Sequence, residues 1–60
     1  MIYEITIGET ASLAKDIWLI KATNLAAAVE KAETKRSNLD YYSSGWIITS
    51  ARLIGKLERA

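Results

Sequence analysis

The spacing of hydrophobic residues changes once along this chain, between residues 18 and 32. Residues 18–22 form a nearly continuous apolar run, which is typical of a strand. The apolar residues that follow recur at helical spacing: Leu25, Ala28, Val29 and Ala32. Thr23 and Asn24 stand between the two patterns, where the N-cap of a helix belongs. The sequence therefore predicts a strand that leads directly into a helix over roughly residues 24–36.

Two further segments have strand-like patterns. Residues 2–7 alternate, so that Tyr3, Ile5 and Ile7 share one face. Residues 16–22 are then the returning arm of a hairpin, after a loop at 8–12 with Leu13 and Ala14 packed beneath it. A third strand is predicted from Trp46 to about Glu58, with a bend at 50–52 or a bulge at Gly55 because of its length. One of its faces is predicted to carry Ile47, Thr49, Ala51, Leu53 and Leu57, and the other Ile48, Ser50, Arg52, Ile54, Lys56 and Glu58.

The order strand, strand, helix, strand predicts a single small α+β domain over residues 1–60, with the element order ββαβ. A right-handed crossover through the helix places the third strand beside the first. The result is a three-stranded or four-stranded antiparallel or mixed sheet, with one helix packed on one face. Because the helix stripe is mostly alanine, the bulky part of the core must come from the strands. The other face stays open, and Ile2, Ile17 and Leu19 are predicted there as a self-association face.

The composition removes several sources of stability and several classes of function. The chain has 60 residues, no Cys and no His, so it has neither disulfides nor thiolate or imidazole metal ligands. A domain this small often gains stability from a partner chain instead, which makes a homodimer one alternative. The net charge of +1 is low for a nucleic-acid-binding protein. No apolar run reaches the length of about 20 residues that crosses a bilayer, and no signal-peptide pattern is present, so we expect a cytoplasmic protein.

Catalytic chemistry finds little support in the sequence. Without His and Cys, the common general base and the thiol nucleophile are both missing. The carboxylates have no spacing that indicates acid–base catalysis: Glu4, Glu9, Asp16, Asp40 and Glu58. We therefore predict that the protein is not an enzyme and that it has no catalytic, cofactor or metal site.

Aromatic and basic residues form the one candidate binding constellation: Lys35, Arg36, Tyr41, Tyr42, Trp46 and Arg52. Such residues are enriched at the centres of protein interfaces, and they also stack on bases and bind phosphates. In a purely structural interpretation, Trp46 belongs to the core and the tyrosines cover the sheet edge. We predict that Trp46 is in the core, and that the partner-binding residues are Tyr41, Tyr42, Arg36, Arg52 and Lys35. Alanine at both tyrosines should then weaken binding and leave stability largely intact.

The run from Ile20 to Ala28, together with Ala32, resembles a pattern of very small phage and mobile-element proteins. In these proteins a strand leads into a helix that begins Asn/Ser-Leu and has alanines at helical spacing. Some small anti-CRISPR proteins, which bind the surface of a type I surveillance complex, are similar in layout and length. The resemblance covers residues 18–32 and elsewhere only the topology, and no family site motif is matched. The chain also lacks the strongly acidic surface of inhibitors that mimic DNA.

This resemblance implies a small binding or inhibitor protein that occupies a surface of a larger protein or ribonucleoprotein complex, with no cofactor. An anti-CRISPR or another inhibitor of host defence is one concrete form. Two alternatives remain open. The chain could be a small nucleic-acid-binding module, or a homo-oligomeric accessory or structural domain without a ligand.

Overall fold

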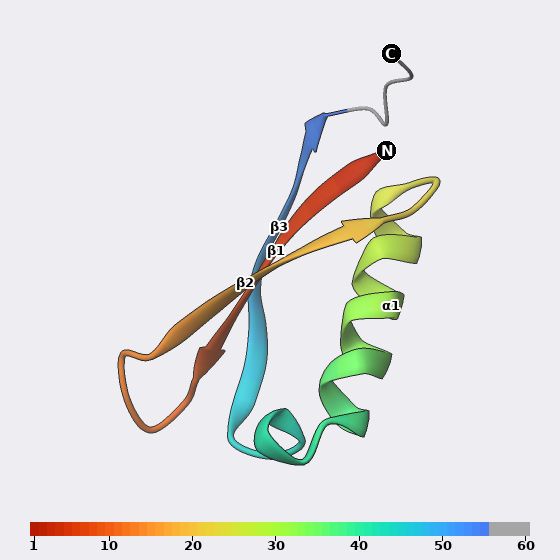
Figure 1. The fold of residues 1–60 in the computed structure, drawn as a ribbon. Coiled ribbons are helices and arrows are strands. Elements are labelled where there is room, and N and C mark those ends of the chain that lie inside the picture. Colours follow the sequence, from red (N-terminus) through yellow and green to blue (C-terminus); the bar gives the residue numbers. More distant parts are fainter. Residues whose placement is uncertain (56–60) are drawn as a thin grey trace.

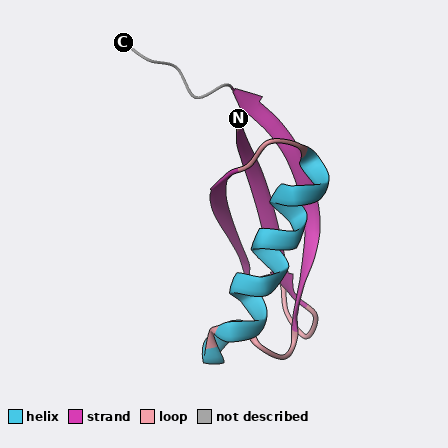
Figure 2. Ribbon diagram, turned by 90° about the vertical axis from the view of Figure 1, so that its right-hand side faces the viewer, coloured by secondary structure: helices cyan, strands magenta, loops and turns pink. Residues whose placement is uncertain are grey.

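A computed structural model describes residues 1–55 of the chain. Three strands, β1 (Ile2–Glu9), β2 (Lys15–Lys21) and β3 (Trp46–Gly55), accompany the helix α1 (Leu25–Asn38) and a short 3-10 turn, η1 (Asp40–Tyr42). The sheet has the order β2-β1-β3, and both outer strands run antiparallel to β1. Helix α1 lies along one face of this sheet (Figures 1 and 2). The predicted ββαβ order and the central position of the first strand are confirmed.

The junction between β2 and α1 has the predicted cap. Asn24 is extended, and its Oδ1 accepts a hydrogen bond of 2.8 Å from the backbone N–H of Ala27. The helix ends at Asn38, and the extended Leu39 donates its N–H to the carbonyl of Arg36 at 3.3 Å. The strand and the helix are thus joined by only three residues, 22–24, which fixes where the helix axis starts relative to the sheet.

Replacing Asn24 with alanine is expected to lower the free energy of unfolding by about 1 kcal/mol, because the Ala27 N–H loses its acceptor. Urea unfolding followed by circular dichroism measures this loss. The matched control is Thr23→Ala, since Thr23 is exposed and lies just outside the cap. Equal stability of the two variants would contradict the assignment of Asn24 as the cap.

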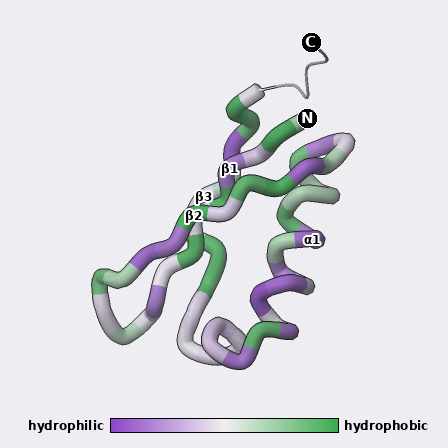
Figure 3. Tube along the Cα trace, viewed as in Figure 1, coloured by the Kyte–Doolittle hydropathy of each residue, from purple (hydrophilic) through white to green (hydrophobic). Residues whose placement is uncertain are grey.

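The core lies between α1 and the central strand. Ile5 and Ile7 of β1 are fully buried, and so are Ala28 and Ala32 of α1. Alanine brings only a methyl group to the contact, so the helix backbone lies close to the sheet while the strands supply the bulk. Figure 3 shows hydrophobic stretches along the strands and a mainly hydrophilic C-terminal half of α1. The prediction that the strands provide the large core residues is confirmed, although Leu25, at the edge of the predicted stripe, is 46% exposed.

The side-chain alternation along β3 differs from the prediction. Ile48 pairs with Ile7 and Ser50 with Thr6, so Thr49 is an extra residue in the register. This irregularity puts Ile48 on the helix side with Ala51, and Ile47 on the other side with Ser50 and Arg52, whereas the predicted alternation grouped Ile47 with Ala51 and Ile48 with Ser50. A second shift makes Ile54 the extra residue, whereas Gly55, where a bulge was predicted, pairs with Ile2. The predicted continuation of the strand to Glu58 lies outside the described residues.

The hairpin loop is another point of difference. Leu13 is 94% exposed, so the prediction that it packs beneath the loop is wrong. The loop is closed by its own backbone, with the Glu9 N–H donating to the Ala14 carbonyl at 3.0 Å. The Thr10 N–H donates to the Gly45 carbonyl at 2.7 Å. The loop extends past the end of the sheet (Figure 1), and the Leu13 side chain is left in solvent.

Within residues 1–55, no helix combines the length and the apolar character needed to cross a membrane.

Candidate functional site: the open face of the sheet

The face of the sheet opposite α1 is the main candidate site, and we call it the open face. Cross-strand partners point to the same side of a sheet, so the register identifies its members. Ile2, Glu4 and Thr6 of β1 pair with Lys21, Leu19 and Ile17 of β2, and with residues of β3. The open face therefore carries Ile2, Glu4, Thr6, Ile17, Leu19, Lys21, Ile47, Ser50 and Arg52. In the described part of the chain, no element covers this face (Figures 1 and 2).

Three large aliphatic side chains of the open face are more than half exposed. These are Ile17 at 59%, Leu19 at 64% and Ile47 at 53%. Ile17 and Leu19 lie two residues apart on β2, so their side chains stand next to one another along that strand. Exposed apolar groups that gather on one surface often mark an interface. The predicted self-association residues Ile2, Ile17 and Leu19 do share one face, as the hairpin register requires.

An ion pair lies in the middle of the open face. Arg52 Nε donates to Glu4 Oε1 at 2.8 Å, and the two residues are direct cross-strand partners. The Arg52 side chain is 68% exposed, so the pair contributes little to folding stability in water. It does hold both charges at defined positions. On its other side, Glu4 is the partner of Leu19, so the charged and the apolar parts of the face are adjacent.

The predicted binding residues are divided between two sides of the molecule. Arg52 belongs to the open face, whereas Lys35 and Arg36 lie on α1, and Tyr41 and Tyr42 lie in η1. The constellation that the sequence suggested is therefore not one surface.

Tyr42 and Arg36 hold the end of the helix against the sheet. The Tyr42 ring meets the rings of Trp18 and Trp46 edge-on, with centroids 5.3 Å and 4.9 Å away. The Tyr42 hydroxyl donates to the Asp16 carboxylate, and this hydrogen bond raises the pKa of Tyr42 above its ordinary value. Arg36 Nη1 donates to the Tyr42 carbonyl at 2.8 Å. These contacts argue against the expectation that Tyr42 can become alanine without loss of stability.

Tyr41 and Lys35 have different surroundings. Tyr41 is 72% exposed, and one side of its ring contacts Tyr42 at a centroid distance of 4.8 Å. Lys35 Nζ lies 4.4 Å from the centroid of the Trp18 ring, in a cation–π arrangement. Trp46 is only 5% exposed, which confirms that it belongs to the core. Of the two tyrosines, only Tyr41 is exposed enough to contact a partner.

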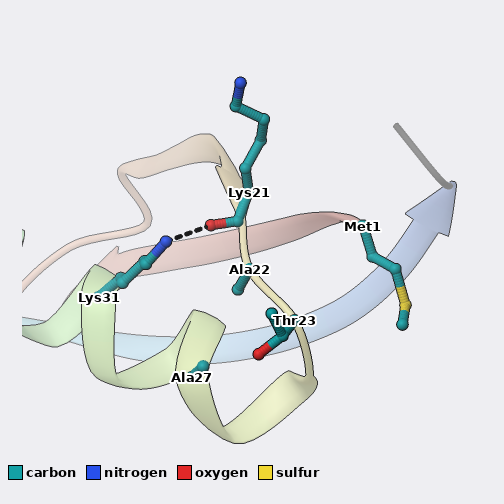
Figure 4. Close-up of a pocket in the computed structure, with 6 residues that line it drawn as sticks. All are labelled: Met1, Lys21, Ala22, Thr23, Ala27 and Lys31. Atoms are coloured by element: carbon teal, nitrogen blue, oxygen red, sulfur yellow. Dashed lines mark hydrogen bonds between the residues drawn. The ribbon is translucent and has the colours of Figure 1, made fainter. Parts of the chain in front are cut away.

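A shallow hollow of about 510 Å³ lies where β1 begins, β2 ends and α1 begins (Figure 4). Its lining residues are Met1, Lys21, Ala22, Thr23, Ala27 and Lys31. Lys31 Nζ donates to the Lys21 carbonyl at 2.7 Å, and the Lys21 side chain points away from the hollow. The polar groups therefore do not converge on a common point, as they do in sites for small molecules. Among residues 1–55, no three acidic side chains gather as they would around a metal ion.

Ile47 is the member of the open face that the predicted alternation of β3 wrongly grouped with Ala51 and Leu53. Its place depends on the extra residue at Thr49, and a run of β-branched residues gives no signal for such an irregularity.

No protein-family model, curated protein or solved structure matches this chain.

Proposed function

We propose that this protein is a small non-enzymatic binding protein that acts by occupying a surface of a larger protein or ribonucleoprotein partner, and that the open face makes the contact. One observation carries the proposal. Three aliphatic side chains are each more than half exposed on the face that also holds the Glu4–Arg52 ion pair: Ile17, Leu19 and Ile47.

The arrangement of this face suits protein recognition. Burying the aliphatic groups removes apolar area from water, which is the main driving force of most protein association. The Glu4–Arg52 pair adds a donor and an acceptor at fixed positions, which favours a partner with complementary charges. The fully buried Ile5 and Ile7 anchor the central strand from the other side. Binding then costs little ordering of the backbone, because the strands are already in place.

Inhibition of a host-defence complex is a concrete form of this function. A protein that blocks a surface needs shape and a few strong contacts but no catalytic group, so a small rigid face is sufficient. The anti-CRISPR activity that the resemblance implies would work in this way. An assay of target-DNA binding by a purified type I surveillance complex, with and without the protein, tests this form directly.

The proposal predicts that the double variant Ile17→Thr/Leu19→Thr loses its partner. Threonine has the β-branched side chain that strands favour, but it removes most of the apolar surface at both positions. We expect the wild-type protein, immobilised and exposed to a lysate of its native host, to retain a specific protein that the double variant does not retain. Quantitative mass spectrometry of the bound proteins is the measurement.

The matched control is Leu13→Thr, since Leu13 is 94% exposed but lies on the hairpin loop and not on the open face. This variant should retain the same protein as the wild type. If Leu13→Thr lost the captured protein and the double variant retained it, the hairpin loop and not the open face would be the contact surface.

The two alternative functions lead to different results. A nucleic-acid-binding module would shift DNA or RNA in a gel at low salt, and its affinity would fall steeply as salt is added. Its contacts would involve the exposed Tyr41 ring and Lys35. A homo-oligomeric domain would show a mass that rises with concentration in light scattering, and the open face would then meet a second copy.

A further inference from the structure

The outer edge of β2 borders the open face and carries backbone N–H and C=O groups that point away from the sheet. The Ala22 N–H donates to the Met1 carbonyl, and the Ala14 carbonyl accepts from the Glu9 N–H, both at 3.0 Å. Even-numbered residues of this arm therefore direct their backbone groups at β1. In an antiparallel pair the direction alternates, so the odd-numbered residues of β2 direct theirs outward. Within residues 1–55, no strand pairs with this edge.

One end of the outer edge is already occupied. Lys31 of α1 donates its amine to the outward-facing Lys21 carbonyl at 2.7 Å (Figure 4). The stretch that remains is centred on Ile17 and Leu19, each of which directs an N–H and a C=O away from the sheet. The side chains of the same two residues are exposed on the open face. Backbone groups and apolar side chains are thus available at the same place.

The surroundings of this edge are basic. Lys35 lies over the Trp18 ring at 4.4 Å and Lys31 contacts Lys21, so α1 holds both amines against β2. Lys15 and Lys21 are the first and last residues of the strand. β2 itself carries one carboxylate, that of Asp16, which accepts a hydrogen bond from the Tyr42 hydroxyl, and the four lysines outnumber it. A segment that approaches this edge therefore meets positive charge on the helix side and at both ends.

We propose that the outer edge of β2 accepts an extended segment of a partner protein as an additional strand, in which acidic residues alternate with apolar ones. Successive side chains of a strand point to opposite faces. One set would lie on the helix side, near Lys31 and Lys35, where carboxylates are favoured. The other set would lie on the open face beside Ile17 and Leu19, where apolar groups are favoured. This inference rests on the proposed function and specifies the chemistry of the partner at one border of the open face.

The same charges disfavour a second copy of this chain at the edge. If two β2 strands paired antiparallel about Trp18, Lys15 of one copy would lie opposite Lys21 of the other. Like charges directly opposite one another destabilise a strand pair, and edge lysines commonly prevent such pairing. A partner strand that has no cations opposite Lys15 and Lys21 avoids this repulsion, and its carboxylates on the helix side meet Lys31 and Lys35.

A short peptide tests the inference on the full chain. The probe is an acetylated and amidated heptapeptide of alternating glutamate and valine, titrated into ¹⁵N-labelled protein at low salt. We expect shifted amide resonances for Ile17 and Leu19 and at least tenfold slower hydrogen exchange at these two N–H groups, since they become hydrogen-bonded. An alternating lysine–valine peptide and a peptide with the same glutamates and valines in two blocks are the controls, and neither should bind.

Charge variants connect the binding to α1. Lys31→Gln/Lys35→Gln should weaken peptide binding about fivefold to tenfold, as expected for two exposed charge pairs. The control Arg52→Gln, which removes a cation from the open face two strands away, should change it by less than twofold. The inference is overturned if neither amide responds at millimolar peptide, or if the lysine–valine peptide binds equally well. If the peptide fails but capture of a partner still depends on Ile17 and Leu19, only strand addition is refuted.

Discussion

Replacing Ile5 with alanine is expected to lower the free energy of unfolding by about 3 kcal/mol. Ile5 is fully buried on the central strand, under α1, between Trp18 of β2 and Ala51 of β3. The alanines of the helix cannot move far enough to fill the space, because their backbone already lies close to the sheet. In a domain of this size such a loss lowers the melting temperature by roughly 15 °C. Urea unfolding, with thermal unfolding as a second measurement, gives both values.

The matched control for Ile5→Ala is Leu19→Ala. Leu19 is an aliphatic residue on a neighbouring strand, but its side chain is 64% exposed on the open face. Its replacement should change the free energy of unfolding by less than about 0.5 kcal/mol, as is usual for surface positions. An equally large loss at both positions would mean that the open face is packed in the folded protein. The face would then not be available to a partner.

Replacing Trp46 with alanine is the second change with a large expected effect, a loss of about 3–5 kcal/mol. Trp46 is 5% exposed, and its ring contacts Tyr42 with centroids 4.9 Å apart. Edge-on aromatic pairs contribute to stability beyond the area that they bury. Loss of the indole would also remove the surface against which η1 packs, so the end of α1 would lose its support from the sheet.

Tyr41→Ala is the control within the same aromatic cluster. Tyr41 also contacts Trp46, at a centroid distance of 5.7 Å, but it is 72% exposed. We expect this variant to stay within about 1 kcal/mol of the wild type in urea unfolding. A loss at Tyr41 as large as that at Trp46 would show that the exposed tyrosine belongs to the structural part of the cluster. It would then no longer be a candidate contact residue.

The fold could be predicted from the sequence because its local signals agree with one another. The change of hydrophobic spacing at Thr23 and Asn24 predicts both the end of a strand and the start of a helix, and Asn24 is the observed cap. The alanine positions in the helix predict a close contact with the sheet, and Ala28 and Ala32 are fully buried. One helix can cover one face, so an open face was predicted as well.

The candidate site could be predicted only in part. The β2 half follows from the simple hairpin register, which places Ile17 and Leu19 on one side. The β3 half depends on the extra residue at Thr49, which exchanges the faces of Ile47 and Ile48 and has no signal in the sequence. Tyr42 and Arg52 are close enough in the sequence to suggest one patch, but the turn of the chain into β3 places them on opposite sides of the sheet.

We expect the open face to bind a protein partner, and the dissociation constant of the captured partner tests this most directly. We expect Ile17→Thr/Leu19→Thr to raise this constant at least hundredfold, since each residue would have to contribute about 1.4 kcal/mol or more at the centre of an interface. Leu13→Thr should leave it within twofold. A constant unchanged by the double variant, measured on protein whose unfolding free energy matches the wild type, would contradict the assignment of the open face as the binding surface.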